Sequence, residues 1–391
     1  MNPSFKTRVT IVSRHLLNRG GLEKWAYQIA QAFVDQKAEV HVLTSDPIPH
    51  SFGDPSLQFH TISLTKRLNA RKIKEFDALC QKWHQQPENG SDIIFGMDRT
   101  RYQTHLRAGN GVHAAYLNYR QMIEGYPRYK KYLNPLNRTL LKIEKEAFED
   151  SNLKIIFTNS HMVKNEILHY YNVSSSRIKV IHNGVNWKER ETDFSNWVAS
   201  KERICHTLQL DPSLFHFVFI GNGYRRKGLH LLMEALATLS LKQFHLSVIG
   251  KEKRLTSFIK QAAHLKLQSN VRFFGFQQDL TPFFQIGDCL VVPSLYDPFA
   301  NVTIEALAMG LFVVSSKTNG GHEVLQKETG TVIENLSDVE SLATALQRAI
   351  KRPKTWDRSN QIRKSVEDYE MSRQLASYTR HSIERCLSPI S

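Results

Sequence analysis

Long apolar runs are absent from the sequence. No stretch of the 391 residues approaches the roughly 18 consecutive apolar residues that a membrane-spanning helix needs. The first residues, MNPSFKTRVTIVSR, also lack the apolar segment of about 7–15 residues that secretory signals contain. These two absences predict a protein that stays in the cytosol.

Cysteine is scarce, and metal-binding patterns are missing. The four cysteines lie far apart, at Cys80, Cys205, Cys289 and Cys386. None belongs to a Cys-x-x-Cys pair or stands at metal-ligand spacing from a histidine. The sequence also contains no Asp-x-Asp and no histidine cluster suited to Mg²⁺ or Mn²⁺. We therefore interpret the cysteines as reduced structural residues and expect no bound metal.

Acidic residues are outnumbered, with 37 Asp and Glu against 52 Lys and Arg, which gives a net charge of +15. Such an excess favours an anionic partner, and charge alone does not choose among nucleic acid, a membrane surface and an acidic substrate. Nearly half of the excess lies in residues 101–145, which contain nine basic residues and only two glutamates. No recognised nucleic-acid module is present, so a nucleic-acid-binding protein, whose binding would weaken steeply with salt, is the less favoured alternative.

The composition, 41% apolar and 23% charged, is that of a globular protein. Its length exceeds what one hydrophobic core usually organises, so we expect two domains. In the first, short apolar runs predict strands at 8–13, 39–44, 92–96, 154–158 and 179–182. Helical spacing of apolar residues predicts helices within 22–33 and 163–170.

After a polar interval at 186–203, the alternation of strands and helices becomes more regular. The expected strands are 217–221, 245–250, 271–275, 289–293 and 312–315, and the expected helices are 229–239, 255–267, 302–309 and 339–350. This order predicts an α/β protein with two doubly wound, Rossmann-like parallel sheets, which bind ligands beyond the carboxyl ends of their strands. We expect domains at 1–185 and 186–365, and a helix at 366–391 that packs back across them.

An acidic pair, Asp297 and Glu305, lies in the segment SLYDPFANVTIEALAMG. The segment joins a strand to a helix that Asn301 could cap. A helix N-terminus favours anions, so this turn suits a nucleotide diphosphate, with Asp297 accepting hydrogen bonds from sugar hydroxyls and Glu305 facing the ribose. On spacing alone, a turn residue and a solvated helix residue explain the pair better.

A basic loop, GNGYRRKG at 221–228, follows another expected strand. Its Arg225, Arg226 and Lys227 could clamp phosphates without a metal, although the loop taken alone slightly favours a solvated basic turn. The loop is neither a Walker A motif nor GxGxxG.

Two glycine-rich turns in the first domain are weaker candidates. Gly20 and Gly21 could let the backbone approach a ligand closely, although a plain turn is the commoner case. His113, which follows the glycine-rich turn in RAGNGVH, could touch the reacting sugar or a phosphate, although a single histidine is more often structural.

Taken together and in this order, the motifs resemble glycosyltransferase family 4, which has the GT-B fold. The resemblance rests on YDPFANVTIEALAMGLFVV, the RKG of the basic loop, TNSHMVKNEILHYYNVSSSRIKVIHNGVN and NVRFFGF. Within the family, GMDRTRYQTHLRAGNGVHAAYLNYR resembles lipopolysaccharide core glucosyltransferases of the WaaG type.

The resemblance implies a retaining, metal-independent hexosyltransferase without a cofactor, in which a first, acceptor-binding domain and a second, donor-binding domain face a cleft. The implied donor is a nucleotide-sugar, namely UDP-glucose. The implied acceptor is a lipid-linked lipopolysaccharide core sugar such as heptose. The residues implied in donor binding are Gly20, Gly21, Arg226, Lys227, Asp297, Phe299, Ala300, Asn301 and Glu305. Those implied at the reacting centre are Asp297, His113 and Asn110.

Two positions depart from the family pattern. The first acid is usually Glu and here is Asp297, which leaves the identity of the donor sugar open. Asn222 stands where the family usually has the first arginine of the donor loop, which leaves two alternatives: Arg225 supplies that charge instead, or the charge is absent. A family 4 transferase with another lipid or capsule acceptor, and a degenerate transferase kept as a sugar-binding or scaffold protein, remain alternatives.

Residues 116–145 mix five tyrosines with Arg and Lys. This mixture suits the headgroup layer of an anionic membrane, so we expect a peripheral protein at the inner face of the cytoplasmic membrane. A solvated basic loop and helix is equally consistent with the segment.

Overall fold

The computed structural model describes residues 6–16, 21–48, 54–125, 127, 129, 133–240 and 243–387. The chain forms two compact units, of which the first consists of Met1–His182 with Ser372–Ser391 and the second of Asn183–Met371. The boundary between the two units, after His182, thus lies close to the expected boundary after residue 185. From Ser372 onward the chain belongs to the first unit again. None of the described helices is long and apolar enough to cross a bilayer.

The first unit contains a seven-stranded parallel sheet in the order β3-β2-β1-β4-β5-β6-β7. The strands are β1 (Arg8–Val12), β2 (Glu39–Thr44), β3 (Leu57–Thr61), β4 (Ile93–Gly96), β5 (His105–Arg107), β6 (Ile155–Thr158) and β7 (Ile178–Val180). The strand order reverses between β1 and β4, as in doubly wound folds. The five strands expected here are confirmed, while β3 and β5 were not predicted.

Helices connect and cover these strands. The bounds are α1 (Gly21–Asp35), α2 (Asn69–His84), η1 (Pro87–Asn89), α3 (His113–Glu124), α5 (Pro135–Phe148), α6 (His161–Tyr170), η2 (Ser175–Arg177) and α15 (Met371–Leu387). In α1, Trp25, Ile29 and Phe33 recur one turn apart and are buried, which gives the helix an apolar face.

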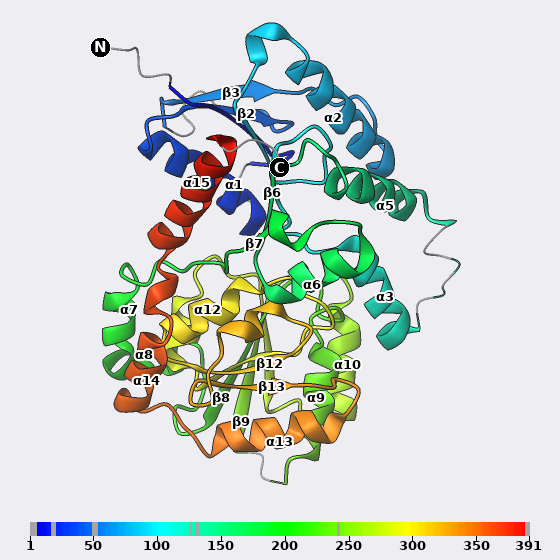
Figure 1. The fold of residues 1–391 in the computed structure, drawn as a ribbon. Coiled ribbons are helices and arrows are strands. Elements are labelled where there is room, and N and C mark those ends of the chain that lie inside the picture. Colours follow the sequence, from blue (N-terminus) through cyan, green and yellow to red (C-terminus); the bar gives the residue numbers. More distant parts are fainter. Residues whose placement is uncertain are drawn as a thin grey trace. The chain divides into compact units, whose positions relative to one another are not determined.

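The last helix, α15, completes the core of the first unit and lies alongside α1 in Figure 1. Tyr378 is fully buried, and its ring packs edge-on against Trp25, Phe95 and Phe157. Its hydroxyl accepts a hydrogen bond from Nε of Arg107 at 3.1 Å. The helix begins at Met371, after a 3-10 turn, η4 (Glu367–Tyr369), and not at residue 366 as expected.

The second unit contains a six-stranded parallel sheet in the order β10-β9-β8-β11-β12-β13. The strands are β8 (Phe215–Ile220), β9 (Phe244–Ile249), β10 (Val271–Gly275), β11 (Cys289–Val292), β12 (Phe312–Ser316) and β13 (Gly330–Ile333). The first five confirm the expected strands within two residues. The sixth, β13, lies at the sheet edge and is half-exposed along most of its length, so its apolar pattern is weak.

The helices of the second unit are α7 (Glu191–Ser195), α8 (Trp197–Thr207), α9 (Leu229–Thr238), α10 (Leu255–His264), α11 (Thr281–Ile286), α12 (Asn301–Ala308), η3 (Gly320–Val324), α13 (Val339–Ile350) and α14 (Trp356–Lys364). The interval 186–203, for which the sequence indicated only a polar composition, is mostly helical. Phe194 and Trp197 are buried there, and α7 and α8 pack against α11.

We expect Tyr378→Ala to lower the free energy of unfolding by about 3–5 kcal/mol, because the change leaves a large cavity between α15 and the first sheet. Chemical denaturation of the full chain measures the loss. Arg380→Ala, at an exposed position of the same helix, is the control and should shift stability by no more than about 0.5 kcal/mol. Equal effects of the two changes would contradict the packing described for α15.

Candidate active site

The connection from β11 to α12 holds Asp297 rigidly. The backbone N–H of Asp297 donates to the carbonyl of Thr318 at 2.9 Å, and its own carbonyl accepts from the N–H of Gly320 at 2.9 Å. Both partners follow β12, the neighbouring strand. Asp297 therefore lies at the carboxyl edge of the sheet, where doubly wound folds bind ligands.

The carboxylate of Asp297 lies within reach of two basic side chains. Its Oδ2 accepts from Nζ of Lys227 at 2.5 Å and from Nη1 of Arg226 at 3.4 Å, while its Oδ1 accepts from the N–H of Phe299 at 3.2 Å. Burial works to raise the pKa of Asp297, but Lys227 and Arg226 outweigh it, so the pKa lies below its ordinary value. The acid and the basic loop that the sequence singled out are thus adjacent and charged.

The basic loop approaches the end of β11 closely. Gly228 has a φ of +77°, and a Cβ there would lie 1.9 Å from the carbonyl oxygen of Pro293. The carbonyl of Arg226 accepts the N–H of Leu295 at 2.9 Å. A Cβ at Gly221 would lie 3.1 Å from the aliphatic carbons of Lys227, which are therefore packed against the loop backbone. Lys227 is 9% exposed, so its ammonium is held in one place.

The N-terminus of α12 differs in detail from the expectation. Asn301 is the first helical residue and does not cap the helix, since its Oδ1 accepts from Nδ2 of Asn183 at 2.6 Å. Ala300 occupies the cap position, and its N–H donates to Oδ1 of Asn319 at 2.9 Å. Among the described residues, the next two N–H groups, of Asn301 and Val302, have no acceptor. These are the groups that remain available to an anion.

Asn319 is a residue of this site that the sequence reasoning missed. It is fully buried, and its Oδ1 also accepts from the N–H of Gly321 at 3.2 Å. Its Nδ2 donates to the hydroxyls of Thr303 and Ser315. These four hydrogen bonds tie the start of α12, through Ala300 and Thr303, to Ser315 of β12 and to Gly321. The turn signal TNGG after the expected strand 312–315 could have indicated it.

Glu305 lies on α12 and is half-buried. Within the described part of the chain, its carboxylate has no hydrogen-bond or ion-pair partner. A partly buried carboxylate without a protein partner is suited to a ligand. Asn222, by contrast, is already engaged, because its Oδ1 accepts from the N–H of Lys251 at 2.7 Å. Arg225 is exposed in the same loop.

In the first unit, His113 and Asn110 have different surroundings. His113 begins α3, its N–H donates to both carboxylate oxygens of Glu144, and its Nε2 lies 3.2 Å from Oδ1 of Asn137. Glu144 also accepts from the hydroxyl of Tyr171 at 2.6 Å. Burial and the Glu144 charge together raise the pKa of Tyr171. Because Glu144 occupies the α3 N-terminus, that helix end offers little to another anion.

Asn110 is exposed and lines a cavity of about 310 Å³, which we call the sheet-edge cavity. Its other lining residues are Arg14, His15, Ile73, Phe76, Asp98, Arg99 and Leu140. Its polar members follow β1, β4 and β5, so the cavity opens at the carboxyl edge of the first sheet. His113 is not among the lining residues. Gly20 lies outside the described residues, and Gly21 begins α1.

Two family models match successive parts of the chain. "Glycosyltransferase Family 4" matches residues 19–189, and "Glycosyl transferases group 1" matches residues 201–380. The chain belongs to glycosyltransferase family 4. This result confirms the resemblance drawn from the order of its motifs.

Curated relatives include glycosyltransferases of lipopolysaccharide core synthesis. The core biosynthesis glycosyltransferase LpsE of Rhizobium meliloti is 30% identical over 34% of this chain. The lipopolysaccharide glucosyltransferase WaaG of Escherichia coli K12 is 31% identical over 34% of this chain. The chain spans only 38% and 36% of the length of these two relatives.

Solved structures match over almost the whole chain. The crystal structure of WaaG has a TM-score of 0.77 at 18% identity, covering 97% of this chain and 100% of WaaG. Anabaena HepE in complex with UDP and glucose has a TM-score of 0.68 at 14% identity, covering 97% of this chain and 99% of HepE. The GT-B fold of this glycosyltransferase is therefore confirmed.

We expect Asp297→Asn to lower the free energy of unfolding at pH 7 by about 3 kcal/mol, because it leaves the buried ammonium of Lys227 without its counter-charge. The pKa of Asp297 is lowered in the folded state, so its contribution is present above the ordinary pKa of about 3.9 and is lost as the pH falls through the folded value. The difference between wild type and variant should therefore shrink below about pH 4.

Denaturant titrations between pH 7 and pH 3 measure this dependence. Glu328→Gln, which removes an exposed acid of the same unit, is the matched control and should show little effect at any pH. A wild-type advantage over Asp297→Asn that stays constant down to pH 3 would refute the ion-pair account.

Proposed function

We propose that this glycosyltransferase moves glucose from UDP-glucose to a lipopolysaccharide core sugar such as heptose, with retention of configuration. The observation that carries the proposal is the constellation at the carboxyl edge of the second sheet. There Asp297, Lys227 and Arg226 lie beside the α12 N-terminus. Glu305 stands unpaired on the same helix within the described residues.

This constellation suits a nucleotide-sugar donor. Lys227, Arg226 and the N–H groups at the start of α12 are positive groups that would hold the diphosphate. Glu305 would accept hydrogen bonds from the ribose hydroxyls, and Asp297 from the sugar hydroxyls. The UDP and glucose bound by HepE support this class of donor. The N–H groups of Phe299 and Ala300 already donate to Asp297 and Asn319. We therefore assign the diphosphate to the N–H groups of Asn301 and Val302 instead.

In the proposed reaction, the bond between the anomeric carbon and the diphosphate breaks as negative charge grows on the leaving group. The acceptor hydroxyl attacks the same face, forms the new glycosidic bond and gives its proton to the departing diphosphate. Lys227 and Arg226 would stabilise the leaving charge as fixed cations, which replaces the role of a metal. We propose no metal and no cofactor for this step.

The acceptor would bind the first unit. The sheet-edge cavity contains Asn110 beside Arg14, His15, Asp98 and Arg99, a polar lining suited to saccharide hydroxyls. His113, bonded to Asn137, would act by positioning the start of α3 near that edge. The basic, tyrosine-rich segment 116–145 would hold the enzyme at the inner face of the cytoplasmic membrane, where a lipid-linked acceptor is available.

A panel of labelled UDP-, GDP- and ADP-sugars tests the donor site. We expect turnover with UDP-glucose, a loss of about 10²–10³-fold in Lys227→Ala because a fixed stabilising cation is removed, and a comparable loss in Asp297→Ala. EDTA should leave the rate unchanged. The anomeric configuration of the product, read by NMR, reports retention.

Lys253→Ala, which removes another exposed lysine of the second unit, is the matched control and should retain full turnover. Circular dichroism verifies that each variant is folded. Full activity in both site variants would remove the site assignment, and a product of inverted configuration would remove the retaining mechanism.

A further inference from the structure

A second and larger cavity lies in the first unit, between α2 and α5. Its volume is about 620 Å³, within the range of about 300–1,000 Å³ of small-molecule sites. We call it the α2–α5 cavity. It is lined by Ala70, Arg71, Lys74, Asp77, Arg101, Pro135, Arg138, Thr139, Lys142, Ile143 and Glu146. None of these was singled out as a site residue by sequence reasoning.

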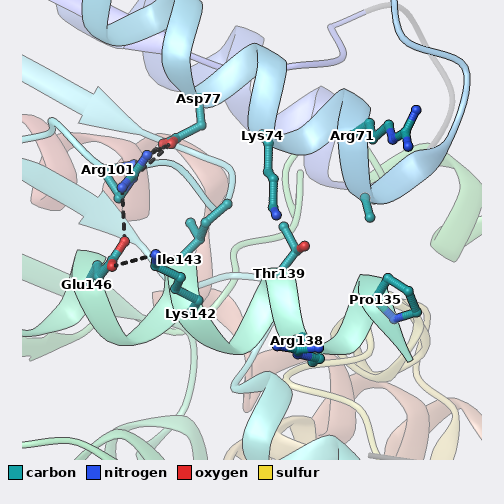
Figure 2. A pocket seen from close by; sticks show the side chains of 11 residues that line it. Arg71, Lys74, Asp77, Arg101, Pro135, Arg138, Thr139, Lys142, Ile143 and Glu146 are labelled. Atoms are coloured by element: carbon teal, nitrogen blue, oxygen red, sulfur yellow. Dashed lines mark hydrogen bonds and ion pairs between the residues drawn. The ribbon is translucent and has the colours of Figure 1, made fainter. Parts of the chain in front are cut away.

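The acidic residues of this cavity are already neutralised. Asp77 is 1% exposed and accepts from the N–H of Arg101 at 2.7 Å, from its Nε at 2.8 Å and from its Nη2 at 2.5 Å. Glu146 accepts from Nη1 of Arg101 at 3.0 Å and lies 3.7 Å from Nζ of Lys142. These two acids and two bases balance in charge and form one continuous, ion-paired wall (Figure 2).

Three basic side chains of the cavity remain without an opposite charge. Among the described residues, Arg71, Lys74 and Arg138 have no hydrogen-bond or ion-pair partner for their side chains. Arg71 and Lys74 lie one turn apart on α2, and Arg138 lies on α5. In Figure 2, Lys74 points from α2 across the cavity toward Thr139 on α5. The cavity therefore carries three unbalanced positive charges.

This arrangement has the chemistry of a phosphate site. Separated cations on two helices, with a hydroxyl at Thr139, match a compact group that has several acceptor oxygens. The apolar members Ala70, Pro135 and Ile143 add surface against which a sugar ring can pack. A volume of about 620 Å³ exceeds what a phosphate alone would fill, which favours a phosphate attached to a larger molecule.

The α2–α5 cavity is also connected to the sheet-edge cavity by shared elements. Ile73 and Phe76 of α2 and Leu140 of α5 line the sheet-edge cavity, and they alternate along both helices with residues of the larger one. The two cavities therefore lie along the same pair of helices in the first unit, the one at the sheet edge and the other between the helices.

We propose that the α2–α5 cavity binds a phosphate group carried by the saccharide acceptor, and so selects phosphorylated acceptors. The proposal rests on the proposed function, in which the first unit holds the acceptor. Lys74, Arg71 and Arg138 contact the phosphate, while the Asp77–Arg101–Glu146 cluster keeps the opposite wall in position.

Calorimetric titration of the full chain with glucose 6-phosphate, inorganic phosphate and glucose tests binding. We expect glucose 6-phosphate to bind, glucose not to bind, and Lys74→Gln and Arg138→Gln each to weaken binding about tenfold, because each removes a charge-assisted hydrogen bond. Lys82→Gln, at an exposed position of α2 outside the cavity, should leave the affinity unchanged. Equal affinities in all three variants would overturn the proposal.

A vesicle-binding experiment distinguishes a sugar phosphate from a lipid headgroup as the ligand of the cavity. Sedimentation with phosphatidylglycerol vesicles should be the same for wild type and Lys74→Gln. If Lys74→Gln instead weakened vesicle binding and left the affinity for glucose 6-phosphate unchanged, the cavity would bind a lipid headgroup. The proposal would then be wrong.

Steady-state kinetics distinguish a failure of this proposal from a failure of the proposed function. With UDP-glucose as donor, Lys74→Gln should raise KM for a phosphorylated heptose acceptor about tenfold, and leave donor hydrolysis and KM for the dephosphorylated acceptor unchanged. Donor hydrolysis that persists while the two acceptors respond equally would overturn only the cavity assignment. If the wild type turned over no donor at all, the proposed function would fail, and the calorimetry would decide the cavity.

Discussion

The ion pair between Lys227 and Asp297 is the interaction on which the candidate site depends. It joins the β8–α9 loop to the β11–α12 connection, and both partners are nearly buried. A buried pair gives little net stability over apolar residues, but the loss of one partner is costly. Such a pair is well placed to respond to an anionic ligand, because a diphosphate offers Lys227 a second counter-charge.

Neighbouring contacts keep that pair and the start of α12 in a fixed geometry. The side chain of Asn319 links Ala300 and Thr303 at the start of α12 to Ser315 of β12 and to Gly321. At the opposite end, the buried Arg363 donates to the carbonyl of Ala308 at 2.6 Å and stacks on the ring of Trp187. A site whose charged groups do not have to reorganise during the reaction stabilises a developing charge most effectively.

The first unit shows how residues far apart in sequence complete a core. Tyr378 fills the space among Trp25, Phe95 and Phe157, and Arg107 lies 4.7 Å from the Trp25 ring centroid. The same sheet forms the sheet-edge cavity, and its covering helices α2 and α5 form the larger basic one. The unit that carries the basic excess of residues 101–145 thus concentrates part of it in a defined cavity.

Local patterns in the sequence were sufficient to predict the central strands and to single out Asp297 and Lys227, which the fold brings together. Strands such as β8 and β9 are continuous apolar runs because both faces of a parallel sheet are buried, and Asp297 and Lys227 lie in short motifs at strand ends. β3 and β13 are edge strands with partly exposed residues, and β5 contains the polar His105 and Arg107, so their patterns were weak.

The roles of Asn319 and of the cations around the α2–α5 cavity became visible only in the folded chain. Asn319 meets Ala300 across 19 residues of sequence, and Lys74 and Arg138 come from different helices. Local propensity acts over a few residues, and a lone Asn or Lys has no pattern that distinguishes it from a solvated one. Which polar groups find a partner is decided by long-range packing, and that alone separates the paired acids of the cavity from its unpaired cations.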